Sequence, residues 1–99
     1  MPEFHADEGD AEDLRELLHR DPDLRHLRVR KRADLLTVES GAKDDPVRHV
    51  RLRHVTLHKW TLEIATHMGV WQFTGERGLM KDIVNFVRQQ CPWVLQPVE

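Results

Sequence analysis

From Leu27 onwards, apolar and polar residues alternate along the chain, which is the period of a β-strand with one buried face. The alternation changes phase once early on. Leu27 and Val29 have odd numbers, whereas Leu36 and Val38 have even ones. A tight turn at residues 33–34 would pair Val29 with Val38 and bring both sets to one face. The pattern predicts a β-hairpin here, and one continuous strand with a bulge at the same point fits nearly as well.

More strands of an antiparallel sheet are predicted further along. Residues 41–46 form the clearest loop, because they combine glycine, adjacent acids and proline. A third strand follows with Val50 and Leu52. A change of phase then indicates a turn or bulge around residues 55–58, with a fourth strand after it.

The next hairpin is predicted to turn at residues 68–69, where glycine can take the positive-φ position of a two-residue loop. That turn sets Ile64 opposite Phe73. In the same register Thr66 lies opposite Trp71. Five apolar side chains are then expected to face the core: Trp60, Leu62, Ile64, Trp71 and Phe73.

A helix is predicted on each side of the strands. Asp10 is the expected N-cap of the first helix, in which leucines follow at helical spacing until Pro22 ends it. The second is expected over residues 78–91, with the apolar residues 93–95 packing back on the sheet. We therefore predict an α+β fold: an N-terminal helix, a four- to five-stranded antiparallel meander sheet, and a C-terminal helix packed on one sheet face.

The domain organisation follows from length and composition. Ninety-nine residues can bury one apolar core and not two. Residues 1–9 are acidic with little to bury, so we expect a flexible acidic arm followed by a single domain over residues 10–99. The single cysteine cannot form an internal disulfide, and no apolar run approaches the roughly 18 residues of a membrane span. These features predict a cytoplasmic protein without a membrane partner.

Charge is strongly segregated along the chain, although its net value is only −2. Residues 1–24 hold nine acids and two bases, whereas residues 25–59 hold ten bases and four acids. If the apolar residues of the first and third strands face the core, the residues between them face the other way. The candidate binding residues on that face are Arg28, Arg30, Arg32, His49, Arg51 and Arg53.

Guanidinium groups bind phosphate and carboxylate through paired hydrogen bonds, so the arginine-rich face predicts an anionic partner. We favour a small non-enzymatic regulatory module, monomeric or homodimeric, that binds an acidic protein surface. Sequence-nonspecific binding of nucleic acid is the alternative. The expected burial of Trp60, Trp71 and Phe73 and the absence of tyrosine argue against single strands, whose readers expose aromatic rings. Two other interpretations stay open: a solvated face of paired charges, and an acidic N-terminal segment that covers the arginines as an internal mimic.

No pattern predicts a cofactor or a metal ion. His54 and His58 are four residues apart, which in a strand separates them by roughly 13 Å. Ser40 lacks the strand-to-helix turn of a hydrolase nucleophile, and Cys91 is expected to be a small buried hydrophobe. A small histidine-dependent enzyme, with a histidine beside an acid such as Glu63, is the second alternative function.

Overall fold

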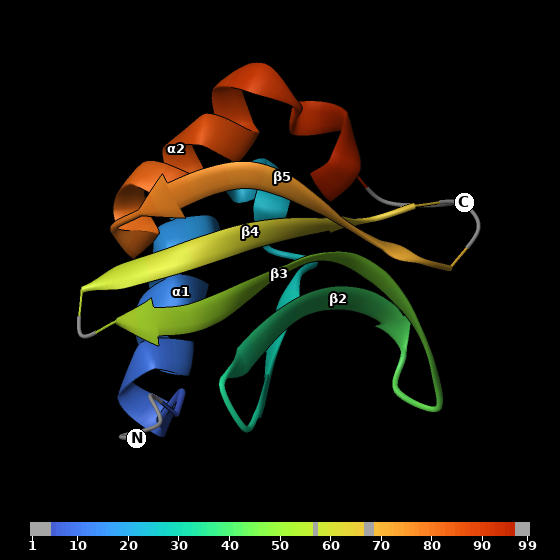
Figure 1. Ribbon diagram of the computed structural model, residues 1–99. Helices are drawn as coiled ribbons and strands as arrows, with labels where there is room; N and C mark the ends of the chain where they lie inside the picture. The colour runs from blue at the N-terminus through green and yellow to red at the C-terminus, as the bar shows by residue number, and fades with distance from the viewer. Residues whose placement is uncertain (1–4, 57, 67–68, 97–99) are drawn as a thin grey trace.

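The computed structural model describes residues 5–56, 58–66 and 69–96. Within them the strands form one antiparallel sheet in the order β1-β2-β3-β4-β5, so neighbours in sequence are neighbours in the sheet (Figure 1). This confirms the predicted α+β fold with a meander sheet. In chain order the elements are α1 (Glu8–His19), η1 (Pro22–Leu24), β1 (Arg28–Arg32), β2 (Leu35–Ala42), β3 (Asp45–Thr56), β4 (Lys59–Ala65), β5 (Trp71–Gly78), α2 (Met80–Gln90) and η2 (Pro92–Leu95), where η denotes a 3-10 helix.

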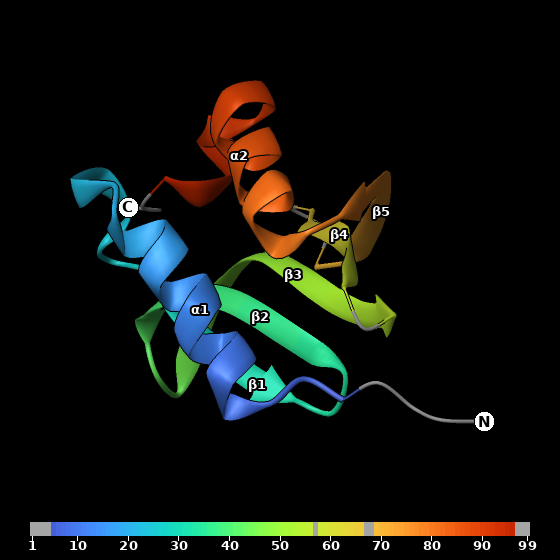
Figure 2. The ribbon, with the colours of Figure 1, turned by 90° about the vertical axis from the view of Figure 1, so that its left-hand side faces the viewer.

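Both α-helices lie on the same face of the sheet, behind it in Figure 1 and beside it in Figure 2. Helix α1 packs against β1 and α2, whereas α2 packs against β4 and β5. The short helix η2 packs on β3. The packing of the C-terminal helix on one sheet face is thus as predicted, and no described helix covers the opposite face.

Helix α1 begins earlier than the sequence indicated. Its N-cap is Asp7, whose side chain accepts a hydrogen bond from the Asp10 backbone N–H at 2.8 Å. The Asp10 carboxylate in turn accepts from the Asp7 N–H at 3.0 Å, so the two aspartates form a reciprocal capping box. Ala6, within the segment expected to be a flexible arm, is buried and donates its N–H to the Ala33 carbonyl at 2.9 Å. Residues 1–4 lie outside the described part of the chain.

The first three strands follow the predicted alternation closely. Val29 pairs with Val38 across β1 and β2, which confirms the predicted hairpin. The expected loop over residues 41–46 is shorter than predicted, because Ala42 pairs with Asp45 and leaves only a two-residue turn. Gly41 has a φ of 81°, a conformation that glycine adopts without steric cost.

The β4–β5 hairpin differs from the prediction by one residue. Ala65 pairs with Trp71 and Glu63 pairs with Phe73, so the expected pairing of Ile64 with Phe73 is wrong. The Thr66 N–H donates to the Val70 carbonyl at 2.9 Å, which places three residues in the loop instead of two. Met68, on which the predicted turn depended, lies outside the described residues. Because side chains alternate with period two, this shift turns Trp71 and Phe73 away from the core.

The C-terminal segment packs back on the sheet only in part. Helix α2 covers Met80–Gln90 with Leu79 as its N-cap, so it begins two residues later than predicted and ends one residue earlier. Leu95 is buried and Val94 packs against the core, as expected. The Trp93 side chain is instead 67% exposed, because one 3-10 turn cannot direct three successive side chains to the same face.

The core lies between the sheet and the helices. Its buried apolar side chains come from every layer: Leu14 and Leu18 of α1, Leu36 and Val38 of β2, Val50 and Leu52 of β3, Trp60 and Leu62 of β4, and Ile83, Val84 and Val87 of α2. Trp60 is thus the one tryptophan of the three that is buried. No helix among the described residues is long and apolar enough to cross a membrane.

Candidate functional site

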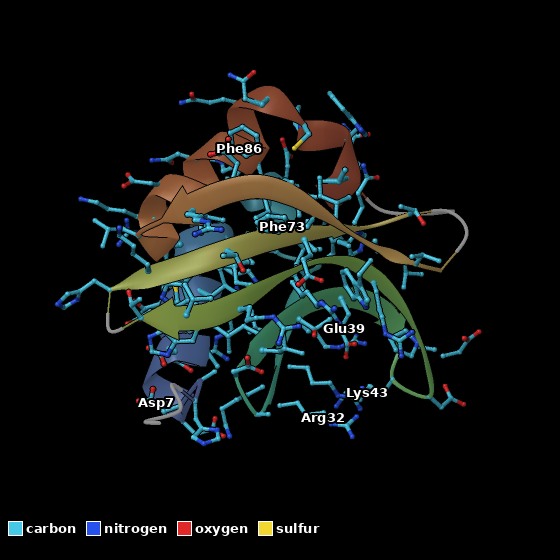
Figure 3. The ribbon with its side chains drawn as sticks, in the orientation of Figure 1. Asp7, Arg32, Glu39, Lys43, Phe73 and Phe86 are labelled. Carbon is cyan, nitrogen blue, oxygen red and sulfur yellow. The ribbon has the colours of Figure 1, made fainter. Side chains whose placement is uncertain are left out.

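The sheet face without helices, hereafter the open face, collects charged and aromatic side chains from all five strands (Figure 3). The side chains of Arg51 and Arg53 lie together on this face, because both form ion pairs with Glu63 on the neighbouring strand. The remaining members follow from the strand register. Besides Arg51 and Arg53, its basic residues are Arg28, Arg30, Arg32, Arg48 and Arg77; its acids are Glu39 and Glu63, and its aromatic residues are Trp71 and Phe73.

Five of the six candidate binding residues lie on this face as the strand parity predicted, and His49 does not. Strand β3 contains one extra residue opposite β2, where the register shifts between Val38 and Glu39. Val38 pairs with Val50 and Glu39 pairs with Arg48, so His49 is left between the two pairs. This bulge turns the His49 side chain to the helix side and brings Arg48 to the open face.

Two arginines at alternate positions of β3, Arg51 and Arg53, are held by carboxylates. Arg51 Nε donates to Glu63 Oε2 at 2.8 Å and its Nη2 lies 2.6 Å from the same oxygen. Arg53 donates to Asp34 Oδ2 at 3.0 Å and lies 3.6 Å from the other oxygen of Glu63. These contacts fix the two guanidinium groups in place. They also bear out in part the interpretation of a face with paired charges.

Arg28 is held more loosely than Arg51 and Arg53. Its Nη1 donates to the Gly41 carbonyl at 2.6 Å, while its Nη2 lies 3.9 Å from Glu39 Oε1. Both Arg28 Nη2 and the second oxygen of Glu39 are buried without a hydrogen-bond partner. Electrostatic attraction without a hydrogen bond therefore joins this pair.

Four further arginines are exposed and form no ion pair with any described residue: Arg30, Arg32, Arg48 and Arg77. Sequence reasoning found the first two and missed the others. Arg48 was missed because the bulge reverses its parity. Val47 has an odd number and Val50 an even one, and this change in the phase of the apolar residues was the sequence signal for the bulge. The open face thus carries an excess of unpaired positive charge.

Trp71 and Phe73 occupy alternate positions of β5 on the open face. The Arg51 guanidinium carbon lies 4.5 Å from the centre of the Trp71 ring, within the range of a cation–π contact. The Phe73 side chain is 51% exposed. The expectation that both rings belong to the core is therefore wrong, and of the three rings whose expected burial argued against single strands only Trp60 is buried.

A shallow pocket of about 230 Å³ opens beside Trp71 at one end of the sheet. It combines an aromatic ring, the unpaired guanidinium of Arg48 and the Thr66 hydroxyl, contributed by three different strands or their ends. Its lining residues are Pro46, Val47, Arg48, Ala65, Thr66, Gly69 and Trp71.

On the helix side, His49 takes part in a buried hydrogen-bond chain. Its Nδ1 lies 2.7 Å from the Val94 carbonyl, which can only accept, so Nδ1 carries the proton and Nε2 accepts from the Ser40 hydroxyl at 2.7 Å. Burial lowers the pKa of His49 below its ordinary value of 6.5, and His26 lowers it further, against an opposing effect of the Val94 hydrogen bond. Ser40 and His49 are only 6% and 3% exposed, so a substrate cannot reach this pair without local unfolding.

The acidic N-terminal segment lies on the helix side, because α1 packs there (Figure 2). Among the described residues, its acids form one ion pair with the basic strands, between Glu8 and Lys31 at the edge of the sheet, at 3.9 Å. The interpretation in which this segment covers the arginines is therefore wrong for the described residues. Acidic and basic surfaces occupy opposite sides of the molecule.

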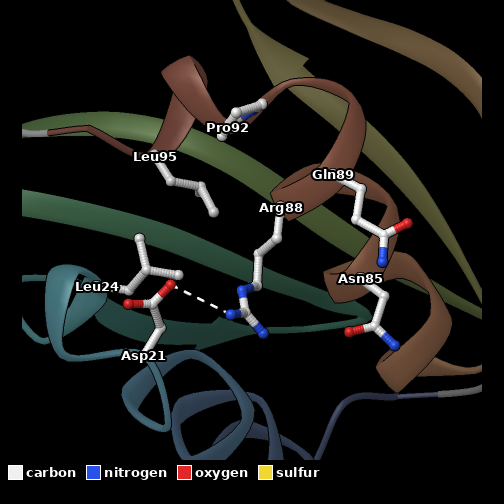
Figure 4. A pocket seen from close by; sticks show the side chains of 7 residues that line it. All are labelled: Asp21, Leu24, Asn85, Arg88, Gln89, Pro92 and Leu95. Atoms are coloured by element: carbon white, nitrogen blue, oxygen red, sulfur yellow. Dashed lines mark hydrogen bonds and ion pairs between the residues drawn. The ribbon is translucent and has the colours of Figure 1, made fainter.

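A second hollow, of about 240 Å³, lies between η1, α2 and η2 (Figure 4). The guanidinium of Arg88 in its wall is already paired with Asp21 at 3.2 Å. A groove of about 330 Å³ between α1 and the start of α2 is lined by Asp10, Asp13 and Glu16. Neither combines unpaired charge with exposed aromatic rings, so the open face is the better candidate site.

The described residues contain no group of three or more histidine, cysteine, aspartate or glutamate side chains placed to hold a metal ion. Cys91 is buried, as expected, and burial raises the pKa of its thiol above 9.0. Comparison with protein-family models, curated proteins and solved structures found no match for this chain. The function is therefore inferred from the open face itself.

Proposed function

We propose that this protein is a small binding module that holds nucleic acid on its open face. The observation that carries the proposal is the set of four exposed, unpaired arginines, Arg30, Arg32, Arg48 and Arg77, beside Trp71 and Phe73. Unpaired guanidinium groups on a surface attract phosphates and release the counterions around them. The module binds its partner without transforming it.

The charge balance of the face supports an anionic partner even though the chain is net negative. Seven arginines stand against Glu39, Glu63 and the neighbouring Asp34, whereas the acids of α1 lie on the other side of the sheet. A strand of phosphates lying across the sheet meets several arginines at once. We expect binding with little dependence on sequence, because phosphate contacts carry no base information.

The test measures binding of a labelled single strand and its duplex at low and moderate salt by fluorescence anisotropy. A triple variant, R30E with R48E and R77E, removes unpaired charges without breaking any ion pair of the structure. We expect it to lose binding and to flatten the salt dependence, since each lost contact to a single strand lowers the log–log slope by about 0.7.

The matched control changes three exposed bases on the helical segments, R20E with R25E and K81E. It alters net charge by the same amount and should bind like the wild type. A wild type that binds neither strand nor duplex would overturn the proposal. Equal loss of binding in both triple variants would overturn it too, because net charge and not the open face would then control affinity.

An acidic protein surface is the second candidate partner. Arginine and aromatic residues are enriched at protein interfaces, and Trp71 and Phe73 add apolar area to the open face. The carboxylate of Glu63 within the face is tolerated better by a protein, which can supply its own donors, than by phosphates. Binding of a poly-glutamate peptide, lost in R30E/R48E/R77E, with no binding of nucleic acid would favour this candidate.

A further inference from the structure

The two aromatic rings of the open face stand in a geometry that a duplex cannot use. Trp71 and Phe73 lie two residues apart on one face of β5, a spacing of about 6.8 Å along a strand. Successive bases of a stacked duplex strand rise by about 3.4 Å and already cover each other's faces. Rings at this spacing can stack only on bases that have been separated, as in an extended single strand.

Trp71 is held ready for such contacts. One side of its ring is approached by the Arg51 guanidinium at 4.5 Å, and Arg51 is itself fixed by Glu63 at 2.6 Å. The ring therefore loses little freedom when a ligand binds, which lowers the entropic cost of association.

The pocket beside Trp71 limits the size of what it can take. Its volume of about 230 Å³ lies below the roughly 300–1,000 Å³ of sites for drug-sized ligands. The lining offers one ring to stack on and the unpaired Arg48 for a phosphate. It also offers the Thr66 hydroxyl, which donates its proton to the Val70 carbonyl and can still accept from an amino group on the edge of a base. A single nucleobase with its phosphate supplies all three of these partners.

We infer that the open face is selective for single-stranded nucleic acid, with one base stacked on Trp71 in this pocket, a second on Phe73, and the backbone held by Arg48 and neighbouring arginines. The inference rests on the proposed function and deepens it. Affinity for a single strand then has two sources, phosphate contacts and stacking, whereas a duplex can use only the first.

The experiment compares three probes with the same number of nucleotides and therefore the same charge: a single strand, a hairpin duplex, and a strand whose central residues lack bases. Four variants are measured with each probe: W71A, W71F, F73A and the control W93A, which removes an exposed tryptophan on η2 away from the open face. Circular dichroism verifies the fold of each variant, and F73A and W71F keep the test valid if W71A is unstable.

We expect the single strand to bind more tightly than the duplex or the abasic strand. W71A and F73A should each weaken single-strand binding by about tenfold, W71F should retain most of the affinity, and W93A all of it. Binding of the duplex and of the abasic strand should not change in any of the four variants.

Three results would overturn the inference. Equal affinity for all three probes, lost only in R30E/R48E/R77E, would leave the proposed function standing and remove stacking from it. Equal weakening by W93A and W71A would show that the ring contacts are unspecific. The absence of binding to any probe would overturn the proposed function first, and the inference with it.

Discussion

The Ser40 hydroxyl lies 2.7 Å from Nε2 of His49, and this buried hydrogen bond joins β2 to the bulge of β3. On its other side the His49 ring donates to the Val94 carbonyl, so it also anchors η2 to the sheet. One imidazole thus connects two strands and the C-terminal segment.

Replacing Ser40 by alanine should destabilise the protein. The change leaves His49 Nε2 as a buried acceptor without a donor, which costs about 1–3 kcal/mol in the free energy of unfolding. Urea denaturation followed by circular dichroism measures the loss. T66A is the control, because its hydroxyl bonds the Val70 carbonyl at an exposed turn and should cost less. Equal losses in the two variants would contradict the prediction.

Stability should fall when the pH drops below about 6.5. The folded state lowers the pKa of His49 through burial, so below the ordinary value of 6.5 the unfolded state binds more protons than the folded one. The contribution of neutral His49 is therefore complete above pH 6.5 and is lost as the pH falls through the lowered pKa. Urea midpoints across this range measure it, and H49Q should lack this part of the decline. An unchanged decline in H49Q would show that other groups cause it.

Replacing Asp7 by alanine should weaken the start of α1. The change removes the side-chain acceptor of the Asp10 N–H, while the backbone N–H of residue 7 can still donate to Asp10, and the expected cost is about 0.5–2 kcal/mol in unfolding free energy. D13A removes an exposed acid from the same helix without touching the cap and should change stability by less than about 0.5 kcal/mol. Thermal unfolding distinguishes them, and a D13A loss as large as that of D7A would refute the capping role.

Two tryptophans should differ sharply in their effect on stability. W60A empties a core site, because Trp60 is buried and stacks on His54 with ring centres 4.2 Å apart, and should cost about 3–5 kcal/mol. W93A changes a side chain that is mostly exposed and should cost little. Urea denaturation of both variants tests the difference. A large loss in W93A would mean that η2 packs through this ring.

The alternation of apolar and polar residues correctly predicted the strand pairing wherever neither strand contains an extra residue. The pairing of Val29 with Val38 followed from parity alone, and the same reasoning placed five arginines correctly. Parity fails wherever a strand contains an extra residue, since every side chain beyond that point changes face. His49 was misplaced for this reason.

The sequence did not reveal the two aromatic residues of the site, because the predicted loop between β4 and β5 was one residue too short. Assuming two residues between β4 and β5 put Trp71 and Phe73 in the core, whereas the hydrogen bond from Thr66 to Val70 adds one residue and reverses their direction. Composition could not correct the error, because large aromatic residues are more often buried than exposed. The register of that hairpin depends on tertiary packing, which no local pattern of residues encodes.

The separation of acids on α1 from arginines on the open face has a consequence for how fast a polyanion can associate. The molecule measures 42 × 27 × 24 Å. In about 0.1 M salt, interactions between charges more than roughly 10 Å apart are largely screened. At that salt an approaching polyanion senses only the nearer side. In about 0.01 M salt the screening length grows to roughly 30 Å, and the partner senses the net charge of −2 as well. Adding salt from very low concentration should therefore first raise the association rate and then lower it.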